Sequence, residues 1–283
     1  MADRFRAFEI ESWQHAATAY CDFFAPVTSR LGEPLLDAVA ARAGRRLLDA
    51  ATGPGQLAAA AAARGAFVVG LDITAPMLKV AARNHPGLSL CQADAQQLPF
   101  TERTFDAVVA SFLLPHLAQP EATLAELARV LAGDGRLALT HWDLPEHHRL
   151  MGVFMEALQA AGAQPPAELP LGPPVYDYSR DQALAGLLAG AGLAQVRVET
   201  IRFHHRFASA DAVWAGTLAA TARTGPLIRA QPPECQRAIR AAYDGLVAPY
   251  VRAGALELPI SVKLASGRMS SRAEAADVDE GGS

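Results

Sequence analysis

An alternation of short apolar segments with helical segments, between residues 45 and 141, constrains the fold of this chain more than any other feature. The apolar segments predicted to be strands are residues 45–50, 67–71, 88–91, 105–111 and 136–141. The segments with helical patterns between them are residues 56–64, 77–84 and 121–131. Strands that alternate with helices of about ten residues predict an α/β fold with a parallel sheet and right-handed crossovers. Since the strands are apolar almost throughout, we expect helices on both faces of the sheet.

The segments outside this alternation predict helical additions to one domain that spans residues 45–265. Apolar residues at helical spacing predict an N-terminal helical segment over residues 1–44. Further strands are expected at residues 195–201 and 258–265. Insertions expected to form a helical cap lie at about residues 144–178 and 203–254. Residues 266–283 are polar and acidic, and the absence of core-forming side chains predicts a disordered tail.

Composition excludes several classes of protein. Hydrophobic residues make up 51% of the chain and charged residues 19%, which is enough for a sizeable core. The net charge of -4 argues against general nucleic-acid binding, which needs a broad basic surface. The cysteines Cys21, Cys91 and Cys235 lie far apart, so we expect neither a disulfide framework nor a metal site. No apolar run of 18 residues and no signal peptide is present, so we expect a cytoplasmic protein with no membrane partner.

A glycine turn, Gly53-Pro54-Gly55, follows the first predicted strand and precedes a predicted helix. Glycines allow a ligand to approach the backbone, and the helix presents free N–H groups to it. A plain tight turn would use the same residues. Asp72 ends the second strand about 20 residues later, where an acidic residue can accept both hydroxyls of a ribose. A helix N-cap is the alternative role for this aspartate.

Residues after the third and fourth strands extend this pattern. Asp94 follows the third strand, and its carboxylate can accept a hydrogen bond from an adenine amino group. Ser111 ends the fourth strand, which begins near Asp106. Ligands bind at the carboxyl ends of the strands in open α/β sheets, so we expect these side chains to gather at one edge.

Five segments together resemble a class I S-adenosylmethionine-dependent methyltransferase, close to the subfamily that includes the ubiquinone and menaquinone methyltransferases. The segments, in the order and spacing of that family, are LLDAATGPGQLAAAAA, GLDIT, QADAQQLPF, TFDAVVASFLLPHL and ELARVLAGDGRLAL. The resemblance covers residues 45–143. It implies a Rossmann-like, doubly wound sheet of seven strands, mostly parallel with the last strand antiparallel. It also implies S-adenosylmethionine as the cofactor and S-adenosylhomocysteine as the product.

The resemblance assigns the methionine end of the cofactor to the first strand and its glycine turn. Gly53 and Gly55 would lie against the methionine part, and Asp49 would lie near its amino group. Ser111 would close the pocket. Ala51 stands where the family usually has a third glycine, and its extra methyl group would displace the methionine end slightly.

The same resemblance assigns the ribose and the adenine to the next two strands. Asp72 would hold the ribose, with Ile73 and Met77 beside it. Asp94 and Ala95 would flank the adenine.

The N-terminal helical segment would cover the cofactor site, and two histidines are candidate bases. Tyr20 resembles an aromatic residue that covers the cofactor in several relatives. His116 follows the fourth strand and His141 ends the fifth, where acceptor and cofactor should meet. A base helps only if the acceptor is protonated at the working pH, because proximity alone lowers much of the barrier. Packing or pocket lining is the alternative role for each histidine.

These observations favour O- or C-methylation of a small, largely apolar or aromatic acceptor, such as a phenolic, quinone or polyketide-like metabolite. Residues 111–116 lack the Asn/Asp-Pro-Pro-aromatic signature of amino methylation, which argues against nucleic-acid acceptors. One alternative is a protein of this fold that binds the cofactor but catalyses a reaction such as cyclisation. Another is an NAD(P)-dependent oxidoreductase, since residues 53–58 fit G-x-G-x-x-A, although no Tyr-x-x-x-Lys pair is present. The sequence leaves open whether the chain forms a homodimer.

Overall fold

The computed structural model describes residues 2–166, 169–170 and 172–269, and its centre is one mixed sheet. The strands lie in the order β3-β2-β1-β4-β5-β8-β6, and β7 pairs with β8. Their bounds are β1 (Arg46–Ala50), β2 (Phe67–Asp72), β3 (Ser89–Gln92), β4 (Phe105–Ser111), β5 (Leu131–Trp142), β6 (Leu193–Phe207), β7 (Val251–Arg252) and β8 (Ala255–Met269). β1 to β5 pair in parallel, whereas β8 runs antiparallel between β5 and β6. The predicted α/β sheet with an antiparallel last strand is confirmed.

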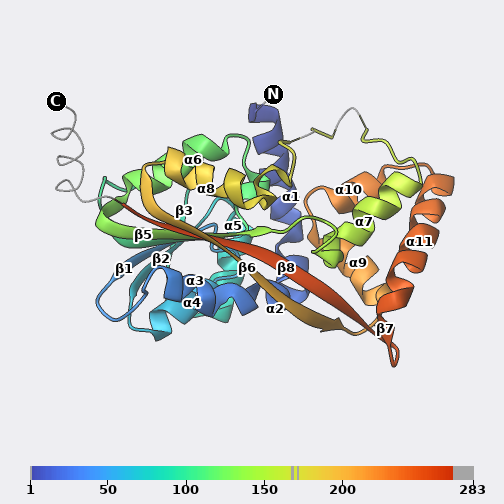
Figure 1. Ribbon diagram of the computed structural model, residues 1–283, viewed down its shortest axis with the longest axis horizontal. Helices are drawn as coiled ribbons and strands as arrows, with labels where there is room; N and C mark the ends of the chain where they lie inside the picture. The colour runs from blue at the N-terminus through green and yellow to red at the C-terminus, as the bar shows by residue number, and fades with distance from the viewer. Residues whose placement is uncertain (1, 167–168, 171, 270–283) are drawn as a thin grey trace.

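Helices cover both faces of this sheet, as its apolar strands predicted (Figure 1). α3 (Gly32–Ala38) and α4 (Gln56–Ala63) lie on one face, and α6 (Pro120–Arg129) and α8 (Asp181–Gly190) lie on the other. Leu124 and Leu127 of α6 are fully buried. Leu35 and Leu36 of α3 are buried as well, with exposures of 1% and 0%. α5 (Ala75–Asn84) follows β2 and contacts both β2 and β3. Burial on both sides explains why the central strands have no polar face.

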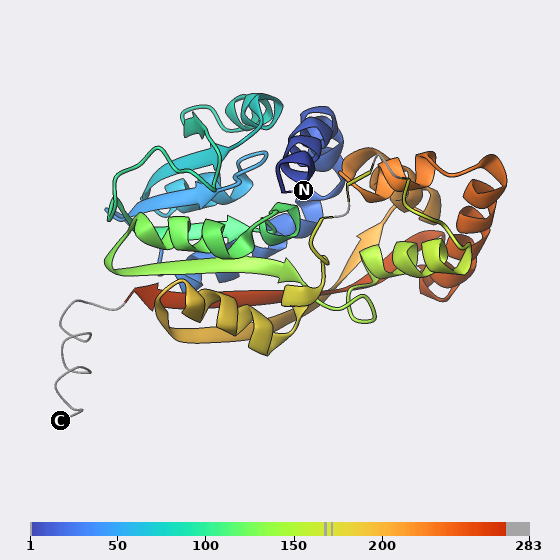
Figure 2. The same cartoon turned by 90° about the horizontal axis from the view of Figure 1, so that it is seen from above.

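A helical cap extends from one end of the sheet (Figure 1, Figure 2). Its helices are α7 (Arg149–Ala160), α9 (Ala210–Ala220), α10 (Thr224–Arg229) and α11 (Pro233–Val247). β6 and β8 are longer than predicted, and their paired ends reach out of the core toward the cap. The predicted start of the second insertion at residue 203 therefore lies inside β6. The strand β8 also passes the predicted tail boundary at 265, and residues 270–283 of that tail lie outside the described residues.

The N-terminal helix α1 (Ala2–Phe23) lies between the core and the cap (Figure 2). It contacts α5 of the core on one side and α9 of the cap on the other. A short helix α2 (Ala25–Thr28) connects it to α3. The 3-10 turns are Ser29–Leu31, Leu114–His116, Asp177–Ser179 and Ala248–Tyr250. This placement puts α1 over the carboxyl ends of the parallel strands.

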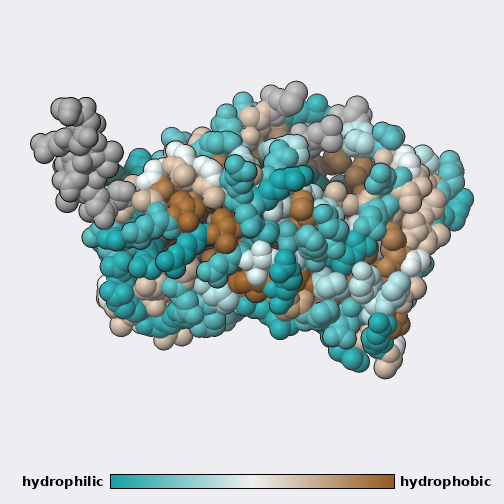
Figure 3. Space-filling model, viewed as in Figure 1, coloured by the Kyte–Doolittle hydropathy of each residue, from teal (hydrophilic) through white to brown (hydrophobic). Residues whose placement is uncertain are grey.

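The outer surface in Figure 3 is mostly hydrophilic, with apolar side chains in separate spots. Phe67, Met155 and Val251 are the exposed large hydrophobic residues of the described chain. Within the same residues, no helix has the length and hydropathy needed to cross a bilayer. A more extended apolar surface lines a cavity between the core, α1 and the cap.

Candidate active site

A cavity of about 880 Å³ lies at the carboxyl ends of β1, β2 and β4. The chain leaves β1 and β4 in opposite directions across the sheet, and ligands bind at such a switch point in doubly wound folds. Its volume is near the upper end of the range for small-molecule sites, about 300–1,000 Å³. The core, α1 and the cap each supply part of the lining.

The cavity brings together most of the residues predicted to bind a cofactor. The predicted residues that line it are Tyr20, Ala51, Gly53, Asp72, Ile73, Met77, Asp94, Ala95, Ser111 and His116. Asp49, Gly55 and His141 lie outside the lining. These residues come from α1 and from the ends of four consecutive strands, so the fold gathers what the sequence separates.

The glycine turn after β1 serves two different purposes. Gly53 has a φ of 53°, and a Cβ there would meet nothing within 4 Å, so its backbone faces open space. Gly55 has a φ of 86°, and a Cβ there would lie 3.0 Å from the Cβ of Ala81. Gly55 is therefore required by the packing of the turn against α5. It does not line the cavity, although the sequence predicted that it would lie against the methionine part of the cofactor. Ala51 has a φ of 60°, the left-handed region that favours glycine, which explains why a glycine is common at this position.

Asp49 is buried behind the turn with one carboxylate oxygen unsatisfied. Its Oδ2 accepts a hydrogen bond from Thr52 Oγ1 at 2.7 Å. Its Oδ1 has no hydrogen-bond partner among the described residues. Burial raises the pKa of Asp49 to about 7. A buried oxygen of this kind is costly to leave unpaired, and a cationic ligand group beside the turn would satisfy it.

Asp72 ties the end of β2 to the glycine turn. Its Oδ2 accepts from the Gly53 backbone N–H at 3.0 Å, and its Oδ1 accepts from the backbone and hydroxyl of Thr74. Burial raises the pKa of Asp72, although these hydrogen bonds oppose the increase. The N-cap of α5 is Thr74, so the alternative role of Asp72 as a helix N-cap is wrong. Asp72 instead lines the cavity and holds the backbone on either side of it.

Asp94 and Ser111 mark two other strand ends in the cavity. The Asp94 carboxylate accepts hydrogen bonds from Nε of Arg6, on α1, at 2.6 Å and from the Gln96 backbone N–H. An adenine amino group at Asp94 would share the carboxylate with Arg6. Ser111 Oγ lies 3.2 Å from Thr140 Oγ1 of β5, which holds it at the cavity wall.

Tyr20 of α1 lines the cavity beside other aromatic side chains. Its ring stacks on Phe24 with centroids 5.6 Å apart and meets Trp13 edge-on at 5.4 Å. Burial raises the pKa of Tyr20, so its hydroxyl stays protonated at neutral pH. The aromatic cluster gives α1 an apolar face toward the site.

The two histidines proposed as bases have different environments. His116 lines the cavity, and its Nδ1 bonds Glu9 Oε2 at 2.8 Å. His141 is 1% exposed, and its Nε2 donates to the Val175 carbonyl at 2.8 Å. Burial lowers the pKa of His141 to about 4. Neighbouring residues of a strand face opposite sides, so Trp142 of β5 faces the cavity and His141 does not. The prediction of His141 as a base is not supported.

The part of the cavity away from the glycine turn is lined mainly by apolar side chains of the cap. Met151, Met155 and Leu158 come from α7, and Trp142 comes from the end of β5. The Trp142 ring stacks between Phe112 and His148, with centroids 3.9 and 4.1 Å away. Such a compartment suits an apolar or aromatic ligand.

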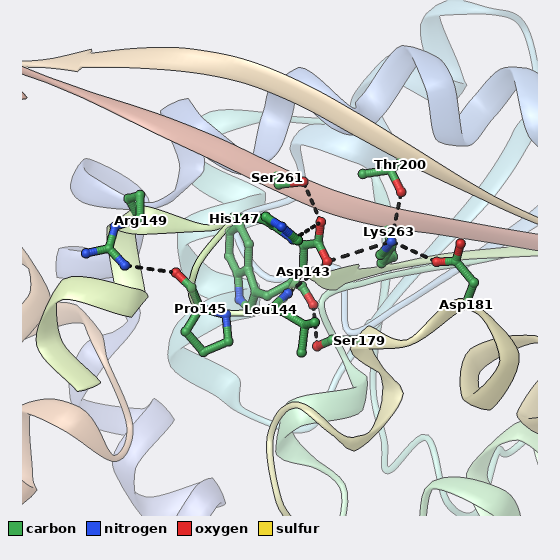
Figure 4. A network of polar contacts seen from close by, with 11 residues as sticks. Asp143, Leu144, Pro145, His147, Arg149, Ser179, Asp181, Thr200, Ser261 and Lys263 are labelled. Carbon is green, nitrogen blue, oxygen red and sulfur yellow. Dashed lines mark hydrogen bonds and ion pairs between the residues drawn. The ribbon is translucent and has the colours of Figure 1, made fainter. Parts of the chain in front are cut away.

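A buried polar network holds this wall to the sheet (Figure 4). Asp143, next to Trp142, accepts from Ser261 Oγ of β8 at 2.7 Å. Lys263 of β8 lies 3.7 Å from Asp143, 2.7 Å from Asp181 of α8 and 2.8 Å from Thr200 of β6. The network therefore joins β5, β6, β8 and α8 at the base of the cap.

The charged residues that join α1 to the rest of the site were not predicted from the sequence. Glu9 is 4% exposed, and its Oε1 lies 3.2 Å from Arg223 Nε, between α9 and α10. Glu9 stands on the apolar stripe of α1 between Phe5 and Trp13, and a carboxylate on such a stripe was the available signal. Nothing in the sequence indicated that Arg223 would reach it.

Comparisons with known proteins identify the family. Residues 48–139 match a methyltransferase domain. The chain is 37% identical over 134 residues to the demethylmenaquinone methyltransferase of Renibacterium salmoninarum, covering 47% of this chain and 56% of that protein. It is 33% identical over 167 residues to the demethylmenaquinone methyltransferase of Streptomyces griseus, covering 56% of this chain and 73% of that protein. The chain belongs to the S-adenosylmethionine-dependent methyltransferases. It resembles their menaquinone subfamily, as the five sequence segments predicted.

Solved structures of this methyltransferase fold agree with the architecture. Phosphoethanolamine N-methyltransferase 2 of Haemonchus contortus superimposes with a TM-score of 0.57 at 14% identity, covering 94% of this chain and 60% of that one. The cyclase SpnF superimposes with a TM-score of 0.51 at 19% identity, covering 86% and 82%. These likenesses concern the fold alone. The sequence matches to methyltransferases favour neither the cyclase-like alternative nor the oxidoreductase. As a member of this methyltransferase family, the protein uses S-adenosylmethionine as its cofactor.

Proposed function

We propose that this methyltransferase transfers a methyl group to a ring carbon or hydroxyl of a small aromatic acceptor, of the reduced naphthoquinone or related phenolic class. The observation that carries the proposal is a single cavity that joins the predicted cofactor residues to an apolar compartment. The relatives named as demethylmenaquinone methyltransferases support a quinone-type acceptor.

The residues at the glycine turn fit the methionine end of S-adenosylmethionine. The unpaired Asp49 Oδ1 is suited to the ammonium group, and the open backbone at Gly53 leaves room for a close approach. Asp72 would receive the ribose, and Asp94 the adenine. Asp49 does not line the cavity, so it would reach the ammonium from behind the turn.

The cap would exclude water and orient the acceptor ring. S-adenosylmethionine supplies an electrophilic methyl group when it is bound. Trp142, Met151 and Met155 offer apolar surfaces against which an aromatic ring can pack. His116 is the cavity-lining group that can take a proton from an acceptor hydroxyl. Holding the two reactants in contact accounts for most of the expected rate increase.

Methyl transfer from labelled S-adenosylmethionine tests this function directly. The acceptor panel contains short-chain 2-prenyl-1,4-naphthoquinols, simple phenols, a protein extract and total tRNA. We expect label in the naphthoquinols or phenols only. Label confined to protein or tRNA would contradict the proposed acceptor class. Turnover that continues when S-adenosylhomocysteine replaces the methyl donor would support the cyclase-like alternative instead.

Two features predicted from sequence stay predictions: a cytoplasmic location and, if the chain self-associates, a homodimer. Light scattering on the purified chain between about 1 and 100 μM would measure its mass in solution. The mass of one chain throughout that range would exclude the homodimer under those conditions.

A further inference from the structure

Glu9 is an unusual residue to find inside this protein. It lies on α1 with 4% exposure, and burying an ionised carboxylate is costly unless it is paired. Its Oε2 accepts hydrogen bonds from His116 Nδ1 at 2.8 Å and Trp13 Nε1 at 3.1 Å. Its Oε1 faces Arg223 Nε at 3.2 Å. Burial would raise the pKa of Glu9, but these partners together lower it below its ordinary value, so the side chain is a carboxylate.

The contact defines the state of the His116 ring. A carboxylate only accepts hydrogen bonds, so Nδ1 of His116 carries the proton that it donates to Glu9. Nε2 is then the nitrogen with a free lone pair, in a side chain that lines the cavity and is 29% exposed. The indole of Trp13 meets the imidazole edge-on at 4.9 Å and limits its rotation. A buried carboxylate that fixes the tautomer of a histidine and stabilises its protonated form is the arrangement that makes histidine an effective base.

The parts of this arrangement come from three separate regions of the chain. Glu9 and Trp13 belong to α1, His116 to the turn after β4, and Arg223 to the junction between α9 and α10. Arg223 is itself fixed by a hydrogen bond to the Pro115 carbonyl at 2.6 Å. The arrangement therefore exists only when α1 is docked between core and cap.

We propose that Glu9 is a positioning residue that makes His116 the general base for an acceptor hydroxyl, so that docking of α1 completes the catalytic site. This inference rests on the proposed function, because it requires an acceptor with an ionisable aromatic or enolic hydroxyl. The hydroxyl proton moves to His116 Nε2 and its electron pair stays with the acceptor. That pair, or the ring carbon it activates, forms the bond to the methyl carbon while sulfur takes the pair of the broken C–S bond. Glu9 stabilises the resulting imidazolium.

The simplest competing explanation is that Glu9 only fastens α1 to the core. Glu9→Gln separates the two roles, because the amide keeps the shape of the side chain and can still accept from Nδ1–H, but it has no charge to stabilise an imidazolium. Glu11→Gln is the matched control, since Glu11 is an exposed glutamate on the same helix. His116→Asn removes the base itself.

The first measurement is the kinetics of methyl transfer to the best naphthoquinol or phenol of the panel. We expect kcat to fall about 10²-fold in both Glu9→Gln and His116→Asn. The double variant should be no slower than His116→Asn, because the two residues act as a unit. The Kd for S-adenosylhomocysteine should stay near that of Glu11→Gln. A lower melting temperature is expected in Glu9→Gln, because the amide leaves Arg223 without its anionic partner. An unchanged kcat in Glu9→Gln, or losses that add in the double variant, would overturn the proposal.

The second measurement does not depend on activity. ¹⁵N NMR of the imidazole groups reports the tautomer and the titration of His116. The charged groups nearest to it are Glu9 on α1 and Arg223 of the cap, with His141 of β5 and Tyr176 beside them. We expect the Nδ1–H tautomer, and protonation of His116 at lower pH in Glu9→Gln than in the wild type. An Nε2–H tautomer or an unchanged titration would overturn the inference even if methyl transfer is observed. If no acceptor is methylated, the proposed acceptor fails while this measurement still decides the role of Glu9.

Discussion

At the scale of single residues, the site depends on buried carboxylates whose charge differs. Glu9 is held ionised by hydrogen bonds from His116 and Trp13 and by the nearby cation of Arg223. Asp49 has only neutral donors, the Thr52 hydroxyl and the Ala58 backbone, and burial raises its pKa to about 7. A buried carboxyl group can therefore supply a fixed negative charge or a proton that is released near neutral pH. The charge and number of the partners around each side chain separate these states, and neither is visible in the sequence.

The first prediction concerns Asp49 and the pH dependence of cofactor binding. If its Oδ1 accepts the ammonium of S-adenosylmethionine, the ligand binds the ionised form, so affinity should rise from pH 6 to pH 8 and then level off. Asp49→Asn should remove this dependence in that range and weaken binding at pH 8 by about 10- to 100-fold, as expected for a hydrogen bond to a charged group. Calorimetric titration with S-adenosylhomocysteine, which carries the same ammonium group, measures both effects.

The pH dependence of the free energy of unfolding of the ligand-free protein is a second test of Asp49. A carboxyl whose folded pKa is raised stabilises the fold at low pH, and this contribution is lost as pH rises from about 4 to 7, because the unfolded chain releases the proton first. Asp49→Asn should flatten that decline in the free energy of unfolding. A wild-type affinity that is constant between pH 6 and pH 8 would show that Asp49 does not meet the ammonium.

At the scale of secondary structure elements, α1 joins the core to the cap through polar contacts at its first half. Arg6 binds Asp94, and Glu9 binds His116 and Arg223. Its second half contributes Tyr20 to the cavity wall. Both halves of α1 border the cavity, so we expect α1 to influence the exchange of cofactor and acceptor.

The second prediction tests this influence through Arg6. The Arg6 side chain is 44% exposed, so its ion pair with Asp94 stabilises the docked helix by at most about 1 kcal/mol. Arg6→Ala should therefore speed dissociation of S-adenosylhomocysteine by up to about fivefold. Added salt should speed dissociation in the wild type and in Glu11→Gln, but less in Arg6→Ala. Stopped-flow measurement after displacement gives the rate, and equal rates in all three proteins would mean that Arg6 does not hold the helix closed.

The elements themselves differed in how well the sequence predicted them. The strands β1 to β4 follow from local apolar runs, because their alternation with helices leaves few other folds. The ends of β6 and β8 were predicted too short, since these ends pair with each other rather than with the core and carry polar residues such as Arg202 and His204. Most of the residues that line the cavity from the strand ends were predicted from motifs, because such motifs are local in the sequence. Arg6 and Arg223 were not, because their partners are about 90 or more residues away in the chain.

At the scale of the whole molecule, the cap and the core are connected through the long strands and the buried network around Asp143. Asp143 is 2% exposed, and burial would raise its pKa, but Ser261, the Leu144 backbone and Lys263 together lower it. Asp143 directly follows Trp142, whose side chain lines the apolar part of the cavity, and Ser179 donates to the Trp142 carbonyl. We therefore expect the charge of Lys263 to contribute to the stability of the fold.

The third prediction concerns Lys263→Met, which keeps the length of the side chain and removes its charge. The change leaves Asp143 without its cationic partner, and we expect the free energy of unfolding at pH 7 to fall by about 1–3 kcal/mol. Because the pKa of Asp143 is lowered in the folded wild type, the loss should shrink only as pH falls below about 4, where Asp143 becomes protonated and no longer needs the cation. Urea denaturation monitored by tryptophan fluorescence measures it.

Arg268→Ala is the control for this experiment, because its ion pair with Asp134 is exposed and should contribute less than about 1 kcal/mol. Adding Asp143→Asn to Lys263→Met should recover part of the lost stability, since removing both partners costs less than leaving one buried charge unpaired. Equal losses in Lys263→Met and Arg268→Ala would show that the buried network does not hold the cap. We expect the Kd for S-adenosylhomocysteine to stay unchanged in Lys263→Met, because the predicted cofactor residues Gly53 and Asp72 follow or end β1 and β2, which β4 and β5 separate from β8.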